Sequence, residues 1–251
     1  MARKYPDPDV KYLFSVSGGR CAYPRCKCLC VVKETKNDKL AVIGQIAHIV
    51  AHSDTGPRGD PNLPEKLRDT YDNWILLCPT HHNLVDKQPN TFSIADLKQW
   101  KSDLEAWFQT LIQQALPKVT FIELEIVTRA IVANPKEPTN DLTLINPLQK
   151  IRFNKLERVS HLITMGLSVA TEVQRFITHN SLYDSTFPEK LTDGFLKEYN
   201  NLVQQGITGD GLYISLMEFA FSSIEGREIV HQSAIIAIMA YLFEKCEIFE
   251  K

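Results

Sequence analysis

The stretch CPTHH, residues 78–82, places two adjacent histidines just behind a cysteine. Four further cysteines, Cys21, Cys26, Cys28 and Cys30, crowd into ten residues nearer the N-terminus. Structural zinc prefers thiolate sulfur and imidazole nitrogen, and it commonly takes two ligands from each of two short loops. These residues therefore predict a metal site, and they raise the question of what the second histidine of the doublet does.

The spacing provides two ligand pairs, C-x4-C and C-x2-H. We predict that these pairs hold a structural Zn²⁺ ion; the four ligands are Cys21, Cys26, Cys78 and His81. Cys28 and Cys30 are competing candidates, because on an alternating strand they would point the same way as Cys26 but lie farther from the turn. The remaining alternative is that the cysteines are small, buried hydrophobic residues.

The composition is that of an ordinary soluble protein, with 251 residues, 44% hydrophobic and 23% charged. This length allows one large domain or two small ones, and a net charge of −2 gives no global reason to expect nucleic acid. No apolar run reaches the roughly 18 residues of a membrane span, and the N-terminus lacks the apolar stretch of a signal peptide. We therefore expect a cytoplasmic protein with no membrane contact, in which clustered cysteines more often bind metal than form disulfides.

Hydrophobic patterning predicts short elements around the cysteines. In order, these are a strand near 26–32, a strand-like run over 40–52, a Gly-, Pro- and Asp-rich loop over 53–73, an apolar run at 74–78 and a short helix near 80–87. A long amphipathic helix follows between Ser93 and Pro117, and Ser93 with Asp96 resembles a capping box. The apolar stripe of that helix indicates packing against a core.

A second region begins near residue 118. It contains a possible strand over 121–127, a linker over 134–141, and helical segments over roughly 149–180, 188–205, 211–224 and 227–248. We therefore expect an α+β protein, with a mixed metal-containing domain over residues 1–117 and a mostly helical domain over 118–251.

Four short motifs follow one another along the chain: the C-x4-C pair, AHI at 47–49, GPRGDP at 56–61, and DNWILLCPTHH at 72–82. In this order and spacing they resemble the HNH endonuclease family over about residues 18–101. Some HNH nucleases of bacterial anti-phage defence share AHI and a CPTHH-like segment followed by an aspartate. The resemblance implies a ββα-metal fold, in which two antiparallel strands, a loop and a helix hold a divalent ion.

The resemblance also implies roles for individual residues. His48 would be the general base that activates a water, Asn73 would fix the loop that orients His48, and His82 would bind the catalytic ion. His81 occupies the position at which the family usually has its fourth zinc cysteine. Imidazole can accept a proton near pH 7, and a hard cation such as Mg²⁺ or Mn²⁺ can neutralise charge on the phosphate.

One position departs from the family pattern. Many members carry an acidic residue or a histidine immediately before the catalytic histidine, whereas this chain has Ala47. Asp86 could replace that ligand, because it follows His82 by four residues on a helix, and His52 is a second option. Arg58 in the glycine-rich loop could clamp a phosphate or be a solvated loop charge.

The second region resembles the C-terminal domain of bacterial ABC three-component systems, to which Lamassu defence systems are related. The resemblance covers about residues 140–251, through INPLQKIRFNKL, GDGLYISLMEFA and AIMAYLFEKCEIFEK. It implies attachment to an ABC- or SMC-type ATPase and an accessory subunit. A generic helical domain that forms homo-oligomers is the alternative. The histidines at 161, 179 and 231 fit packing or surface positions.

The leading hypothesis is a metal-dependent DNA endonuclease that acts as the effector of an anti-phage defence complex. A non-catalytic zinc module that binds nucleic acid and an adaptor held by a zinc knuckle are the alternatives. Scaffolding alone explains neither His48 nor His82.

Overall fold

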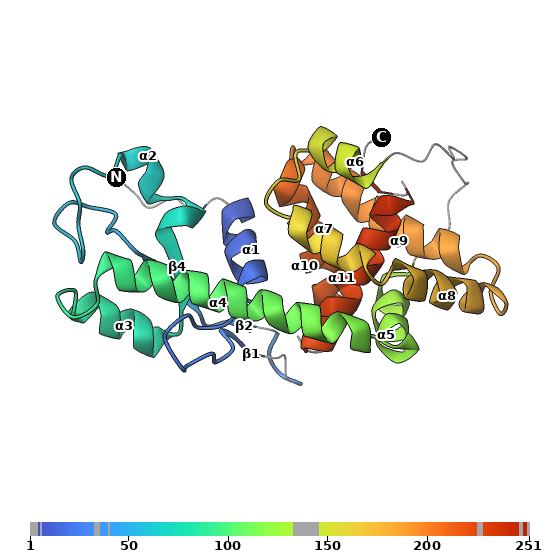
Figure 1. Cartoon of the computed structure of the whole chain (residues 1–251), viewed down its shortest axis with the longest axis horizontal. Coiled ribbons are helices and arrows are strands. Elements are labelled where there is room, and N and C mark those ends of the chain that lie inside the picture. The colour runs from blue at the N-terminus through green and yellow to red at the C-terminus, as the bar shows by residue number, and fades with distance from the viewer. Residues whose placement is uncertain are drawn as a thin grey trace. The chain divides into compact units, whose positions relative to one another are not determined.

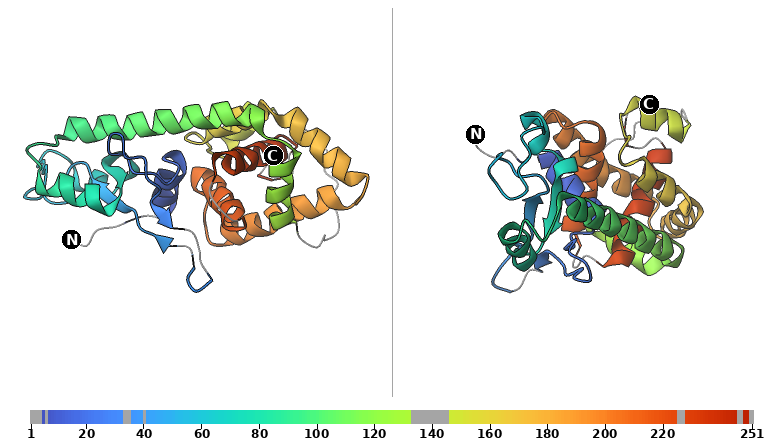
Figure 2. Two further views of the ribbon diagram at one scale, coloured as in Figure 1. Left: turned by 90° about the horizontal axis from the view of Figure 1, so that it is seen from below. Right: turned by 60° about the vertical axis from the view of Figure 1, so that its left-hand side comes forward.

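The computed structural model describes residues 5, 7–32, 36–39, 41–132, 146–224, 228–245 and 248–249. They form an α+β protein in which helices accompany two small antiparallel sheets, as predicted (Figure 1). The chain divides into two compact units, Met1–Thr110 and Leu111–Lys251. The division falls inside the unbroken helix α4, Ile94–Ala115 (Figure 2), a little before the boundary predicted after residue 117.

The first unit is built around strands β3, Gln45–His48, and β4, Trp74–Leu77. They pair antiparallel, with His48 opposite Trp74. Every residue of β4 is buried, and the helix α3, Pro79–Lys87, begins directly after Cys78. The order strand, strand, helix agrees with the arrangement expected from the sequence.

A second, smaller sheet pairs β1, Val31–Val32, with β2, Ala41–Val42. The strand predicted from residue 26 is wrong before Val31, because Arg25 and Lys27 adopt left-handed φ angles of 63° and 51°. The predicted run over 40–52 is also interrupted. The backbone N–H groups of Ile43 and Gly44 both donate to the carbonyl oxygen of Cys30, at 2.8 and 2.9 Å. A Cβ atom at Gly44 would lie 2.5 Å from the Cβ of Cys30, so this approach requires glycine.

Helices α1, Asp7–Val16, and α4 complete the core of the first unit. Leu13, Trp74, Leu97 and Leu104 are almost fully buried in one hydrophobic cluster. The predicted helix start is confirmed, because the Ser93 backbone N–H donates to Asp96 Oδ2 at 2.8 Å and the Asp96 N–H donates back to Ser93 Oγ at 3.2 Å. The predicted loop contains two short helices that the sequence did not indicate, α2, Glu65–Arg68, and η1, Tyr71–Asn73.

The strand predicted over residues 121–127 is wrong. This segment is part of the helix α5, Phe121–Ile131. Thr120 and Glu123 form a capping box at its start, and a side chain that caps the first turn favours a helix over a strand. The buried residues Leu124, Val127 and Ile131 follow helical spacing. The predicted linker over 134–141 lies outside the described residues.

The helix α11, Ile229–Glu244, is buried on almost its whole circumference. Its neighbours (Figure 1) include α5; η2, Leu116–Lys118; α7, Ser160–Leu167; α8, Ala170–Ser181; and α10, Gly209–Ser222. The helix α9, Phe187–Gln204, packs on α8 and α10, and Lys150 of α6, Pro147–Phe153, donates to the Phe243 carbonyl of α11 at 3.0 Å. The helix predicted over 149–180 is therefore three helices. A Cβ at Gly166 would lie 2.5 Å from the Cβ of Ala240, so a glycine lets α7 approach α11 closely. None of the described helices combines the length and the apolar character needed to cross a membrane.

Candidate metal and catalytic site

Four cysteine sulfurs gather at one end of β4. The Sγ atoms of Cys21, Cys26, Cys28 and Cys78 all lie within 4.8 Å of one another, and those of Cys26 and Cys28 are 3.4 Å apart. A tetrahedral zinc site with Zn–S bonds near 2.3 Å separates its sulfurs by about 3.8 Å. The four thiols can therefore hold a metal ion such as zinc.

Local backbone geometry brings these cysteines together. The left-handed conformations at Arg25 and Lys27 curl the chain, and the Cys21 N–H donates to the Cys28 carbonyl at 3.0 Å. The neighbouring Ala22 N–H donates to the Leu76 carbonyl at 2.9 Å, which ties this knuckle to β4. The end of β4 then delivers Cys78 to the cluster.

His81 lies beside the cluster but is not one of its four mutually close ligands. Its Nδ1 atom is 3.1 Å from Cys78 Sγ and 3.5 Å from Cys21 Sγ, and its ring stacks on Tyr23 at 3.9 Å. Burial lowers the pKa of His81, which favours the neutral ring at neutral pH. The geometry therefore favours Cys28 over His81 as the fourth ligand, which differs from the set predicted from the spacing.

Burial opposes the ionisation of two of these thiols. Burial raises the pKa of Cys28 to about 12 and raises the pKa of Cys21 as well. Thiols of this kind remain protonated at neutral pH, and a divalent ion replaces their protons when it binds. Cys30 lies outside the group of four sulfurs and is fully buried in the hydrophobic core, where it behaves as a small apolar residue.

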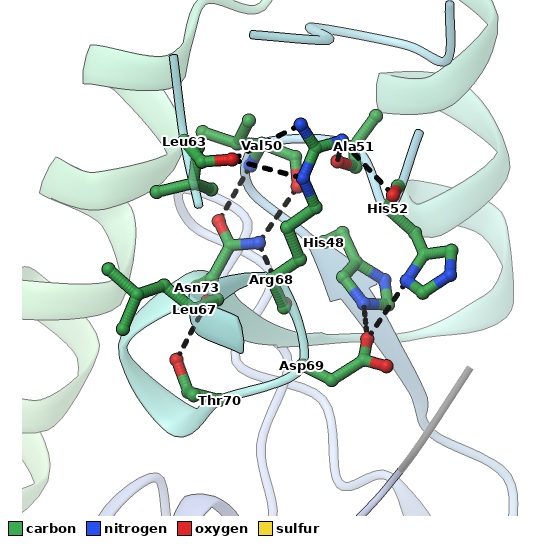
Figure 3. Close-up of polar contacts among 10 residues, drawn as sticks. All are labelled: His48, Val50, Ala51, His52, Leu63, Leu67, Arg68, Asp69, Thr70 and Asn73. Atoms are coloured by element: carbon green, nitrogen blue, oxygen red, sulfur yellow. Dashed lines mark hydrogen bonds and ion pairs between the residues drawn. The ribbon is translucent and has the colours of Figure 1, made fainter. Parts of the chain in front are cut away.

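A second group of ligand-type side chains surrounds the end of β3. His48 Nε2 lies 2.9 Å from Asp69 Oδ1, and His52 Nδ1 lies 3.1 Å from the same oxygen (Figure 3). The side chain of His48 is 7% exposed, whereas those of His52 and Asp69 are 18% and 16% exposed. The group is therefore anchored in the protein and still reaches solvent.

Asn73 fastens the backbone next to this group. Its Oδ1 accepts from the Val50 N–H at 2.8 Å, and its Nδ2 donates to the carbonyls of Val50 at 2.8 Å and Arg68 at 2.9 Å. The Asn73 carbonyl in turn accepts from the Ile49 N–H at 2.8 Å. These bonds hold the loop immediately after His48, the segment to which the family resemblance assigned Asn73.

Arg68 performs the same task from the other side of the loop. Its buried guanidinium donates to the carbonyls of His52 at 3.1 Å and Asp60 at 3.0 Å, and it pairs with the carboxylate of Asp54 (Figure 3 shows its bonds to the 50s and 60s loops). Because Asp69 follows Arg68 directly, one short segment both anchors the loop and presents the carboxylate.

Arg58 has a structural role, which corrects the prediction that it clamps a phosphate. Its side chain is 3% exposed and donates to the carbonyls of Ile49 at 3.1 Å and Val85 at 2.6 Å. It also forms an ion pair with Asp86 Oδ1 at 2.8 Å. A buried guanidinium with these partners joins the loop to α3 and is not available to a solvent-borne phosphate.

His82 and Asp86 lie on one face of α3, as their spacing predicted, with His82 Nδ1 3.7 Å from Asp86 Oδ2. Among the described residues they do not join either group of three or more potential metal ligands. His82 instead lines an open pocket of about 480 Å³ together with Tyr5, Gln45, Ile46 and Asn83. The Tyr5 ring also lies 6.1 Å from the ring of His48, so this pocket adjoins the histidine group.

Ala47 is not a missing ligand beside His48. Consecutive strand residues point to opposite faces, and Ala47 is fully buried in the hydrophobic cluster with Ile49. A polar side chain at this position would enter the core. The face that carries His48 receives its additional ligand-type groups from the following loop.

The sequence analysis missed one important residue and ranked another too low. Asp69 carried no motif signal and lies 21 positions from His48, and Cys28 was ranked below its neighbours because an extended strand was assumed. The clearest available signal for Asp69 was an acidic residue close before Asn73, in a loop that already had His52 near its start.

Comparison with protein families finds no family that matches this chain, and comparison with curated proteins finds no relative.

Proposed function

We propose that this protein is a divalent-metal-dependent endonuclease that hydrolyses phosphodiester bonds in DNA. The observation that carries the proposal is the position of His48 at the end of β3, 2.9 Å from the Asp69 carboxylate. The antiparallel strands β3 and β4 and the helix α3 hold His48 in place, and the cysteine cluster lies at the end of β4. In this proposal the water that attacks the phosphate is activated at His48.

The chemistry requires a nucleophile, charge neutralisation and a leaving group. The water oxygen forms a bond to phosphorus, the bond from phosphorus to the 3′ oxygen breaks, and the 3′ oxygen takes up a proton as the water loses one. A divalent cation supplies Lewis-acid help by neutralising charge on the phosphate. Imidazole is suited to this setting, because it can accept a proton near neutral pH and its neutral form can bind a cation.

The pocket beside His48 supports the same proposal. Tyr5 contributes an aromatic face and is 41% exposed, while Gln45, His82 and Asn83 contribute polar groups. A nucleotide needs both kinds of contact, because bases stack on aromatic rings and phosphates accept hydrogen bonds. The pocket is open, which suits a polymeric substrate.

A plasmid-cleavage assay with Mg²⁺ or Mn²⁺ tests the proposal. We expect the wild-type protein, or its assembly with partners, to nick supercoiled DNA, and His48→Ala to reduce the rate at least about 100-fold. His179→Ala in the second unit is the matched control and should cleave normally. Equal rates for His48→Ala and wild type would contradict the role of His48, and salt-sensitive DNA binding without cleavage would favour the non-catalytic alternative.

We also propose that residues 118–251 attach the nuclease to an ABC- or SMC-type ATPase and an accessory subunit in a cytoplasmic anti-phage defence complex. Large apolar side chains on the described surface of this region support a partner-binding role; they include Phe121, Ile122, Leu182 and Tyr183. Co-expression with such an ATPase should yield a stable complex, and Leu182→Asp with Tyr183→Asp should weaken it. Light scattering of the chain alone separates this outcome from a homo-oligomer.

A further inference from the structure

We infer that His48, His52 and Asp69 form the binding site of the catalytic divalent ion. The catalytic role of this ion rests on the proposed function. The binding site itself can be tested by metal binding alone. It replaces the site expected at His82 and Asp86.

The distances between the three groups fit a common ion. Metal bonds to imidazole nitrogen and carboxylate oxygen are near 2.1 Å, so adjacent ligands of an octahedral ion lie about 3.0 Å apart. The observed separations from Asp69 Oδ1 are 2.9 Å to His48 Nε2 and 3.1 Å to His52 Nδ1. Two imidazoles that converge on a single carboxylate oxygen already have the spacing of adjacent ligands.

The backbone that carries these side chains is held rigidly on both sides. Asn73 bonds the N–H and carbonyl of Val50, two residues after His48. Arg68 bonds the carbonyl of His52 and immediately precedes Asp69 (Figure 3). Metal sites depend on supporting contacts of this kind, because they fix the orientation of each ligand before the ion arrives.

The alternative site is weaker for a physical reason. Asp86 Oδ1 pairs with the buried guanidinium of Arg58 at 2.8 Å, so the carboxylate already neutralises one positive charge. An added cation at Asp86 would compete with that ion pair. Asp69 Oδ1 lies beside two imidazoles, which can themselves bind an ion in their neutral form.

The ligand types indicate which ion binds best. Imidazole favours transition-metal ions and carboxylate favours hard ions, and Mn²⁺ accepts both. We therefore expect tighter binding of Mn²⁺ than of Mg²⁺. In this arrangement His48 contributes to catalysis by holding the ion, which differs from the direct proton transfer implied by the family resemblance.

The test is a Mn²⁺ titration of the protein over residues 1–251, in which electron paramagnetic resonance measures the concentration of the free ion. We expect one Mn²⁺ site per chain in the wild type. Asp69→Asn and His52→Ala should each weaken binding at least tenfold. Asp72→Asn, a nearby exposed carboxylate on η1, is the matched control and should bind normally. Asp86→Asn should also bind normally, and circular dichroism with zinc content confirms that each variant is folded.

The outcomes separate this inference from the proposed function. Unchanged Mn²⁺ affinity in folded Asp69→Asn, or no site in the wild type, would overturn the inference even if the protein cleaves DNA; Asp69 would then only orient His48. One Mn²⁺ site that is lost in Asp69→Asn, in a protein that cleaves no phosphodiester with or without its partners, would support the site and contradict the nuclease function.

Discussion

The guanidinium of Arg58 and the carboxylate of Asp86 form an ion pair, with Nη2 2.8 Å from Oδ1, that joins the loop after β3 to α3. Arg58 also donates to the backbone carbonyls of Ile49 and Val85. The side chain therefore links the segment that follows His48 to the helix that carries His82. A loop charge that looked like a candidate for substrate binding is part of the framework.

Replacing Arg58 with methionine should destabilise the protein, because four acceptors lose their donor: the carbonyl oxygens of His48, Ile49 and Val85 and the carboxylate of Asp86. We expect the free energy of unfolding to fall by about 2–4 kcal/mol in urea denaturation. Arg129→Met is the control, because the Arg129 side chain is 78% exposed and pairs only at the surface of α5; it should change stability by less than about 1 kcal/mol. A similar small effect for Arg58→Met would contradict a framework role.

Asn73→Ala should also destabilise the first unit, since it leaves the backbone N–H of Val50 and two carbonyls without their side-chain partner. A cost of about 2–4 kcal/mol is expected for buried groups of this kind. Asn83→Ala removes an exposed bond to the Pro79 carbonyl and is the matched control, with an expected change below about 0.5 kcal/mol. Thermal or urea unfolding of both variants measures the difference.

The sequence predicted the elements with strong local signals well, whereas it merged three helices over 149–180 into one segment and predicted the site less completely. The β4 strand, α3 and the capped helix α4 follow from burial pattern and capping residues, whose effects are local. The segment over 121–127 alternates like a strand, but the capping box at Thr120 and the packing of Leu124 and Val127 favour a helix. Asp69 could not be assigned from spacing, because only the folded loop brings it to His48. Cys28 was ranked too low because left-handed residues at 25 and 27 break the expected alternation.

Metal content distinguishes the two candidate zinc ligands. Cys28→Ser should lose most of the bound zinc, because it removes one of four sulfurs, whereas His81→Ala should keep close to one zinc per chain. Cobalt substitution adds a second measurement: the visible absorption of Co²⁺ should be that of four sulfur ligands in both the wild type and His81→Ala. Loss of zinc from His81→Ala, with retention in Cys28→Ser, would restore the original prediction.

Chelation of the zinc should affect the two units unequally. The four cysteines that can hold the metal lie in the first unit, so amide hydrogens near residues 21–30 and 74–87 should exchange faster after treatment with a strong chelator. Amides of α7 and α11 should keep their protection. Hydrogen exchange measured by mass spectrometry resolves these regions, and Cys28→Ser without chelator should reproduce the pattern. Uniform loss of protection across both units would show that they unfold together.

The cysteine cluster has a consequence for the order in which the chain folds. Three of its sulfurs, on Cys21, Cys26 and Cys28, belong to one short segment. Cys78 is far from them in the sequence, because strands β1 to β4 and the 50s and 60s loops lie between. A nascent chain can therefore load the ion on its first three thiols while the rest is still being synthesised. Cys78 then closes a long loop, and the ion offsets the entropy lost in that closure. Metal binding by Cys78 would then fix when β4 packs into the first unit and pairs with β3, the strand that carries His48.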